Sequence, residues 1–155
     1  WVYVNAMVYG DAKVYEEATL SGNAEVFGNA KVFGDAKVYE EVEICGDVMI
    51  FGNAMIYGKA VISDKAEVFG NAQVFGNAKV CGNAVISSCS DYIVFKNWWS
   101  SGRYFTWTKS NNMWKVGCFY GSGKQLINKA YMDSELSGNE YERVVRYVDK
   151  DYQNS

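Results

Sequence analysis

Aliphatic residues recur every six positions from Val2 to Ile86, and no position in the series is missed. Six residues advance an α-helix by about 1.7 turns, so this period would scatter the aliphatic side chains around a helix. A short strand followed by a corner fits the period, because each aliphatic side chain then points into one common interior. The period therefore predicts a β-solenoid. The series comprises Val2, Val8, Val14, Leu20, Val26, Val32, Val38, Ile44, Ile50, Ile56, Ile62, Val68, Val74, Val80 and Ile86.

A glycine followed by asparagine or aspartate separates most of these strands, as in Gly28-Asn29 and Gly34-Asp35. Both parts of the pair tolerate the unusual φ angles that a tight corner needs. An alanine stands four positions after most of the aliphatic residues and is small enough to fill the inside of a corner. Three such sides make a coil of about 18 residues, so the repeats predict about five coils with strands about 4.8 Å apart.

The repeat resembles the LpxA-like hexapeptide-repeat family, and the resemblance covers residues 1–88. It implies a left-handed parallel β-helix over these residues, which a second domain over residues 91–155 follows. Members of the family often place the glycine directly after the aliphatic residue, whereas this chain places it one position later. A right-handed solenoid therefore stays open as the alternative.

Three columns of mostly aromatic residues are expected on the outside of this β-helix. A monomer would then expose more apolar surface than solubility favours, which predicts self-association. The resemblance implies a homotrimer, because members of the family commonly pack as trimers. The alternative is that the ladders only stabilise the sheets by stacking. The columns are Tyr3, Ser21, Tyr39, Tyr57 and Phe75; Tyr9, Phe27, Cys45, Ser63 and Cys81; and Tyr15, Phe33, Phe51, Phe69 and Ser87.

Acyl transfer, which many members of the family perform, is not expected of this chain. Those enzymes resemble one another in using a histidine base near the subunit interface, and this sequence contains no histidine. Glu16, Glu40 and Asp64 replace the corner glycine, but they fall on successive faces and are interpreted as solvated corner residues. No metal-ligand or phosphate-loop pattern is present, so neither a metal nor a cofactor is predicted. We expect a protein that is not an enzyme.

The cysteines form no CxxC pair, and Cys45 and Cys81 are expected about 9.6 Å apart by strand spacing, too far for a disulfide. With no visible signal peptide and no apolar run of membrane-spanning length, the sequence predicts a cytoplasmic protein without membrane contact. A net charge of −3 argues against duplex nucleic acid as a partner. Residues 91–155 are the more basic part, with 9 Lys or Arg against 7 Asp or Glu.

Residues 91–155 are predicted to form a small α+β domain. Ser122 with Gln125, and Ser137 with Glu140, are capping-box patterns that predict the starts of two helices. The expected arrangement is a three-stranded antiparallel meander with both helices packed on one face. Runs of β-branched and aromatic residues place its strands at residues 91–96, 103–109 and 113–119.

One segment of this domain, from Lys96 to Lys109, interleaves aromatic residues with basic and hydroxyl side chains. Aromatic rings stack on nucleobases for about 1–3 kcal/mol per base, and cations, hydroxyls and loop amides suit phosphate oxygens. The segment therefore predicts a nucleotide-binding site, and an aromatic core with a polar loop is the alternative. The candidate ligand-binding residues are Trp98, Trp99, Ser100, Ser101, Arg103, Tyr104, Thr106, Trp107 and Lys109.

The stretches 96–131 and 137–142 resemble a domain that follows such repeats in uncharacterised proteins of gut bacteria and their phages. This resemblance implies a setting and no mechanism. We expect a phage or prophage anti-defence protein that sequesters a small anionic, nucleotide-type signal at sites formed by the C-terminal domains of an oligomer. Two alternatives stay open: an inhibitor that binds a host defence protein, and a structural trimerisation module.

Overall fold

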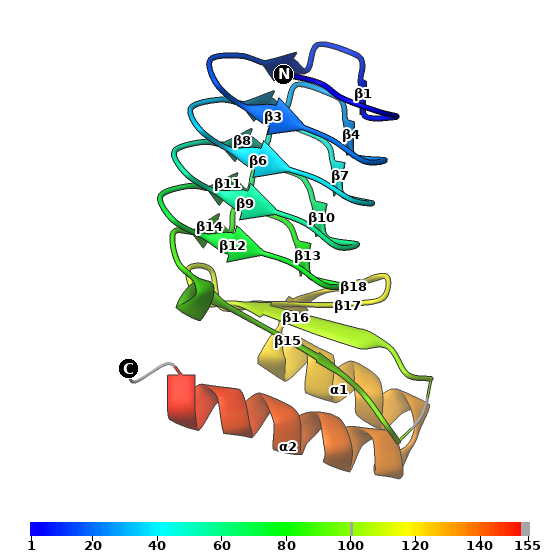
Figure 1. Cartoon of the computed structure of the whole chain (residues 1–155). Helices are drawn as coiled ribbons and strands as arrows, with labels where there is room; N and C mark the ends of the chain where they lie inside the picture. Colours follow the sequence, from blue (N-terminus) through cyan, green and yellow to red (C-terminus); the bar gives the residue numbers. More distant parts are fainter. Residues whose placement is uncertain (100, 153–155) are drawn as a thin grey trace.

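The computed structural model describes residues 1–99 and 101–152. Its N-terminal part is a parallel β-solenoid of about four turns, which Figure 1 shows as stacked coils, and the predicted number of about five coils is not confirmed. The strands are β1 (Met7–Val8), β2 (Lys13–Val14), β3 (Thr19–Leu20), β4 (Glu25–Val26), β5 (Lys31–Val32), β6 (Lys37–Val38), β7 (Glu43–Ile44), β8 (Met49–Ile50), β9 (Met55–Ile56), β10 (Val61–Ile62), β11 (Glu67–Val68), β12 (Gln73–Val74), β13 (Lys79–Val80) and β14 (Val85–Ile86).

Three parallel sheets form the sides of the solenoid. The strand orders are β1-β4-β7-β10-β13, β14-β11-β8-β5-β2 and β12-β9-β6-β3. Every pairing joins residues one coil apart, as in Val8 with Val26, and Val2 adds an isolated bridge to Leu20. The aliphatic residues of the repeat from Leu20 to Ile86 are fully buried between the sheets, together with the corner alanines. The predicted interior is confirmed.

The corners of the solenoid hold backbones with positive φ. Gly58 illustrates the need for glycine, because its φ is 79° and a Cβ there would lie 2.8 Å from the backbone nitrogen of Gly76. Glu16, Glu40 and Asp64 adopt the same conformation without being glycine, with φ angles of 59°, 68° and 64°. A non-glycine residue in this region is strained unless another interaction compensates for it.

That interaction is a hydrogen bond between coils. Each of the three corner carboxylates accepts the backbone N–H of the glycine one coil further on. These residues are exposed, as predicted, but their interpretation as solvated corners missed this bond. The pairs are Glu16 with Gly34 at 2.8 Å, Glu40 with Gly58 at 2.6 Å, and Asp64 with Gly82 at 2.8 Å.

Replacing Asp64 with alanine is expected to lower the free energy of unfolding by about 1–2 kcal/mol, because the variant loses the bond to Gly82 and keeps a Cβ at positive φ. Asp64→Gly loses the same bond but relieves the backbone strain, so it should be less destabilising by about 1 kcal/mol. Urea denaturation measures both values. Equal stability of the two variants would show that backbone conformation at this corner costs nothing.

The predicted aromatic columns are present as stacked ladders. Tyr39, Tyr57 and Phe75 stack with ring centroids 5.1 Å and 5.2 Å apart. The column of Tyr15, Phe33, Phe51 and Phe69 stacks in the same way, at 5.0 to 5.1 Å. Such stacking between neighbouring strands stabilises a sheet. Self-association through these ladders stays a prediction.

The C-terminal part is a four-stranded antiparallel sheet, in the order β15-β16-β17-β18, followed by two helices. The prediction of three strands is wrong, because the chain reverses at Gly117, whose φ is 55°, before Phe119. Residues 119–122 therefore form a fourth strand and do not extend the third. The elements are η1 (Cys89–Asp91), β15 (Tyr92–Lys96), β16 (Tyr104–Thr108), β17 (Met113–Val116), β18 (Phe119–Ser122), α1 (Gly123–Asp133) and α2 (Glu135–Tyr152).

Serine residues stand at the start of both helices. Ser122 forms the predicted capping box of α1. The second prediction, a cap at Ser137, is wrong, because α2 already begins at Glu135. Ser134 is the single residue between the helices, and its Oγ accepts the backbone N–H of Ser137 at 3.1 Å. Ser137 therefore lies inside the first turn of α2.

The antiparallel sheet lies across the C-terminal end of the solenoid, with both helices on its far side (Figure 1). There, side chains of the C-terminal part form hydrogen bonds with backbone N–H groups of the last coil, which would otherwise bond to a further coil. In earlier coils, the corresponding N–H groups donate to carbonyls of the next coil. In the last coil they donate to side chains: Lys79 to Thr106 Oγ1 at 2.9 Å, Val85 to Ser110 Oγ at 2.7 Å, and Ser87 to Asp91 Oδ2 at 2.8 Å.

Tyr92 and Asp91 anchor the start of this sheet to the last coils. The Tyr92 hydroxyl donates to the Gln73 carbonyl at 2.8 Å, and burial raises the pKa of Tyr92 to about 12. Partial burial alone would raise the pKa of Asp91, but hydrogen bonds from Ser87 and Ser88 outweigh it and lower that pKa. The C-terminal sheet thus closes the edge that a solenoid otherwise leaves open.

Thr106→Val is expected to lower the free energy of unfolding by about 1–2 kcal/mol, because the isosteric valine leaves the Lys79 N–H without its acceptor. Thr106→Ser keeps the acceptor and should recover most of the loss. Hydrogen exchange at the Lys79 amide provides the specific readout and should accelerate in Thr106→Val only. Unchanged exchange would contradict the closing role of Thr106.

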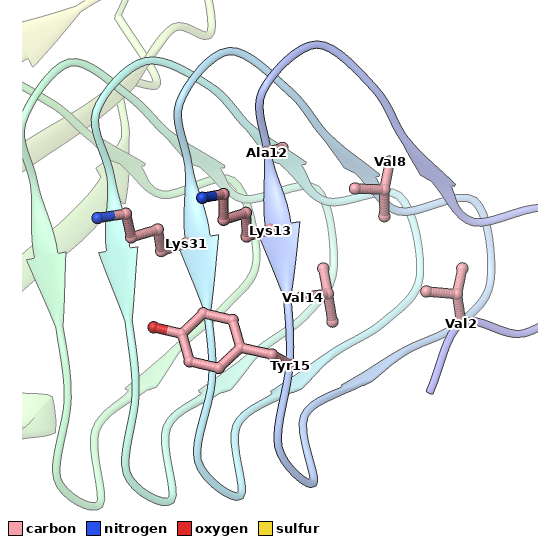
Figure 2. Close-up of a pocket in the computed structure, with 7 residues that line it drawn as sticks. All are labelled: Val2, Val8, Ala12, Lys13, Val14, Tyr15 and Lys31. Carbon is pink, nitrogen blue, oxygen red and sulfur yellow. The ribbon is translucent and has the colours of Figure 1, made fainter.

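The N-terminal end of the described solenoid is open. Figure 2 shows Val2, Val8 and Val14 pointing into the interior of the first coil, while Lys13 and Tyr15 point outward. Together they line a hollow of about 720 Å³. Val2 is 49% exposed, whereas the equivalent positions of later coils are fully buried. The two ends of the solenoid therefore differ, since the chain's own sheet covers only the C-terminal one.

Candidate anion-binding groove

Trp107 lies in the core of the C-terminal part. Its side chain is fully buried, in one apolar cluster with Phe105 and Trp114. Its Nε1 donates to Asn112 Oδ1 at 2.8 Å. No face of this ring is open to a base, so the predicted stacking role of Trp107 is incompatible with its position. For this residue the alternative of an aromatic core is correct.

Two further predicted residues, Thr106 and Lys109, do not join a common site with Arg103. Thr106 is 2% exposed and is occupied by its bond to the last coil. Lys109 follows the end of β16 and Arg103 precedes its start, so the two are separated by about 20 Å of extended strand and cannot hold one phosphate. Ser100 lies outside the described residues.

Trp98 and Trp99 differ in exposure although they are neighbours. Trp98 is 81% exposed. Trp99 is half-buried, packs edge-on against Tyr141 of α2 at 5.9 Å, and contacts the Trp98 ring at 5.0 Å. Trp99 therefore belongs to the junction of sheet and helices. Of the three predicted tryptophans, only Trp98 offers a free ring face.

The loop between β15 and β16 is closed by Asn97, which is 1% exposed. The side-chain Oδ1 of Asn97 accepts the Gly102 backbone N–H at 2.8 Å, and the backbone N–H of Asn97 donates to the Arg103 carbonyl at 2.9 Å. Gly102 has a φ of 66°, which suits glycine. These bonds place Arg103 and Tyr104 at the start of the inner strand β16, close to the last coils, while Ser101 is exposed on the loop.

Arg103 and Tyr104 line a groove together with residues of the solenoid. The groove has a volume of about 260 Å³ and lies where the C-terminal sheet meets the last two coils. Lys59 and Asn77 come from corners one coil apart, and Lys79 comes from β13. The complete lining is Lys59, Asn77, Lys79, Arg103, Tyr104 and Gly117.

The groove gathers three cations and no carboxylate. Lys59 Nζ lies 2.9 Å from Glu41 Oε2, in an exposed ion pair. Among the described residues, the other ion pairs within 4.0 Å involve Arg143 and Arg146, so Lys79 and Arg103 have no carboxylate at that distance. Arg103 also lines a second hollow, on the helix side, which contains Asp133 and Tyr141. Two cations without an ion-pair partner within 4.0 Å nevertheless give the groove a positive potential that attracts anions.

The volume and the side chains of the groove suit the phosphate end of a small anion. Ligand pockets usually measure about 300–1,000 Å³, so this groove would hold a phosphate and a portion of what the phosphate carries. Arg103 offers a planar fork of donors for phosphate oxygens, and Lys79 offers a point charge. The Tyr104 ring, 38% exposed, stands beside them, and Lys96 Nζ lies over it at 6.0 Å from the ring centroid.

Sequence reasoning found Arg103 and Tyr104 but missed Lys59 and Lys79. Both lysines belong to the repeat, where outward positions vary freely and carry no obvious signal. One signal was available for Lys59: every other corner glycine of the repeat is followed by Asn or Asp, and Gly58 is followed by Lys59. The approach of Lys79 to Arg103 depends on the docking of the sheet on the last coil, which no local pattern encodes.

Among the described residues, no group of three or more His, Cys, Asp or Glu side chains is placed to hold a metal ion. Within the same residues, neither helix combines the length and the apolar character needed to cross a membrane.

No family model matches the chain, and searches of curated proteins and of solved structures gave no significant match. The groove is therefore the basis for the proposed function.

Proposed function

We propose that this chain is a non-enzymatic binding protein that sequesters a small anion, of the nucleotide type, in the groove between its solenoid and its C-terminal sheet. The observation that carries the proposal is the convergence of Lys79 and Arg103 from two separate parts of the fold, with no carboxylate of the described residues within 4.0 Å of either. Arg103 and Lys79 would bind phosphate oxygens, Lys59 would add charge, and Tyr104 would contact a base or sugar.

The wider setting belongs to the same proposal. The solenoid would be a left-handed β-helix of the LpxA-like type and would form homotrimers through its aromatic ladders. Support comes from the hexapeptide period and from the exposure of Tyr9 and Tyr15, which belong to the two columns that do not contain Phe75. A phage protein in the bacterial cytoplasm that withdraws an immune nucleotide signal would need this kind of binding without chemistry.

Calorimetric titration of the purified chain against nucleoside phosphates and cyclic dinucleotides tests the proposal. We expect at least one of them to bind with a micromolar or lower Kd, and Lys79→Glu to abolish that binding. Lys31→Glu is the matched control, because Lys31 is an exposed lysine of the same repeat in β5, far from the groove. Absence of binding across the panel, or equal loss in both variants, would contradict the proposal. Native mass spectrometry of the same sample measures the expected trimer.

A second candidate function rests on Trp98. A tryptophan that is 81% exposed is typical of a protein interface, where large aromatic residues are frequent hot spots. Binding of a host defence protein through this ring is therefore the alternative. Loss of such a complex in Trp98→Ala, with nucleotide binding unchanged, would separate it from the first proposal.

A further inference from the structure

β15 is an edge strand of the C-terminal sheet, and half of its backbone groups face away from the sheet. It pairs only with β16 among the described strands. The Asp91 carbonyl accepts the Lys109 N–H, and the Asn97 N–H donates to the Arg103 carbonyl. Hydrogen-bonded pairs alternate along an antiparallel ladder, so Ile93 and Phe95 also bond to β16. The N–H and C=O groups of Val94 and Lys96 consequently point outward.

An apolar hollow lies beside this edge. It measures about 350 Å³ and runs between the solenoid and the strand. On the solenoid side stands Phe75, which is 45% exposed and ends the ladder it shares with Tyr57. On the sheet side stand Tyr92, Ile93 and Val94. A free strand edge and an apolar hollow therefore adjoin one another.

We propose that the β15 edge binds an extended peptide segment of a partner protein by strand addition. Alternating N–H and C=O groups at strand spacing are matched by another extended backbone and by few other ligands. An apolar side chain of the peptide would enter the hollow between Phe75 and Val94. A neighbouring acidic side chain would lie near Lys96, which is exposed and ends the strand.

The hollow favours a single peptide over a second copy of this chain. Phe75 stands across from β15, so the space beside the edge is bounded by the solenoid. A second copy placed edge to edge would bring its own solenoid and Phe75 into that space. The inference is independent of the anion groove, because the two sites share no lining residue.

The test uses Val94→Pro, which removes an outward N–H. Proline is tolerated on an edge strand where its missing N–H faces solvent, so the pairing of β15 with β16 should remain. The probe is a short fluorescent peptide in which valine and glutamate alternate, with a valine–lysine peptide as charge control. We expect fluorescence polarisation to show binding of the acidic peptide and at least ~10-fold weaker binding to Val94→Pro. Thermal unfolding should confirm that the variant is folded.

A second readout does not depend on any variant. In the wild-type chain, the acidic peptide should slow hydrogen exchange at the Val94 and Lys96 amides and leave the Ile93 amide unchanged, because Ile93 already bonds to β16. No slowing at Val94, or equal binding by Val94→Pro, overturns the proposal. A concentration-dependent dimer that Val94→Pro abolishes, without peptide binding, would overturn it in favour of pairing between two copies.

Discussion

Trp107→Ala should be among the most destabilising single substitutions in the C-terminal part, lowering the free energy of unfolding by about 3–5 kcal/mol. The ring is fully buried against Phe105 and Trp114, and its Nε1 is bonded to Asn112. Truncation would leave a large cavity and remove the hydrogen bond to the Asn112 amide oxygen. Urea denaturation followed by tryptophan fluorescence measures the loss.

Trp98→Ala is the matched control for this prediction, since it removes the same side chain from an exposed position in the same hairpin. We expect a change of less than about 0.5 kcal/mol. If the two substitutions cost the same, the two rings would not differ in burial, and the placement of Trp107 in the core would be contradicted. The comparison also separates the two roles that a tryptophan-rich segment allows.

Arg103→Ala and Lys79→Ala should each weaken binding of the nucleotide that binds best by about 10- to 100-fold. A hydrogen bond to a charged group is worth about 1.5–3 kcal/mol, and each variant removes the donor on one side of the groove. The Arg103→Ala, Lys79→Ala double variant should lose more affinity than either single variant. Raised salt should lower the affinity of the wild type more than that of the double variant. Calorimetry at two salt concentrations provides both numbers.

Lys31→Ala serves as the control for loss of one positive charge. Its binding should match the wild type, because Lys31 lines the hollow at the open N-terminal end and not the groove. A similar loss in Lys31→Ala would attribute binding to net charge. Full affinity in the Arg103→Ala, Lys79→Ala double variant would exclude the groove as the site.

The solenoid was predictable because each of its requirements is local and repeated. A strict period of six, glycine corners and small inner residues each constrain the same backbone, and every coil repeats the constraint. Glu16, Glu40 and Asp64 break the local rule of glycine at the corner. At these positions a carboxylate, such as that of Asp64, accepts a hydrogen bond from the backbone of the next coil. That compensation acts between coils and is invisible in a single hexad.

The C-terminal part was less predictable because some of its segments fit more than one local structure. The run from Met113 to Phe119 looks like one strand, yet the positive φ of Gly117 divides it into two. Ser137 has Glu140 at capping-box distance, yet α2 begins at Glu135, and the Oγ of Ser134 accepts the Ser137 N–H. Strand alternation places Phe105 and Trp107 on one face of β16, but it carries no information on whether helices cover that face.

The groove itself arises from docking. Arg103 is held by the loop bonds of Asn97, and Lys79 is held by the position of the last coil, whose backbone N–H bonds to Thr106. The bond from Lys79 to Thr106 joins residues 27 positions apart in the sequence, so no local motif contains the site. The sequence could therefore indicate a basic, aromatic segment, but not which of its side chains share a surface.

The central claim is tested most directly by an amide NMR titration of the wild-type chain with the nucleotide that binds best by calorimetry. The account predicts that the largest chemical-shift changes occur at Asn77, Lys79, Arg103, Tyr104 and Gly117, with the open N-terminal coil unaffected. Changes confined to the Trp98 loop or to the first coil, or no changes at a saturating concentration, would contradict it.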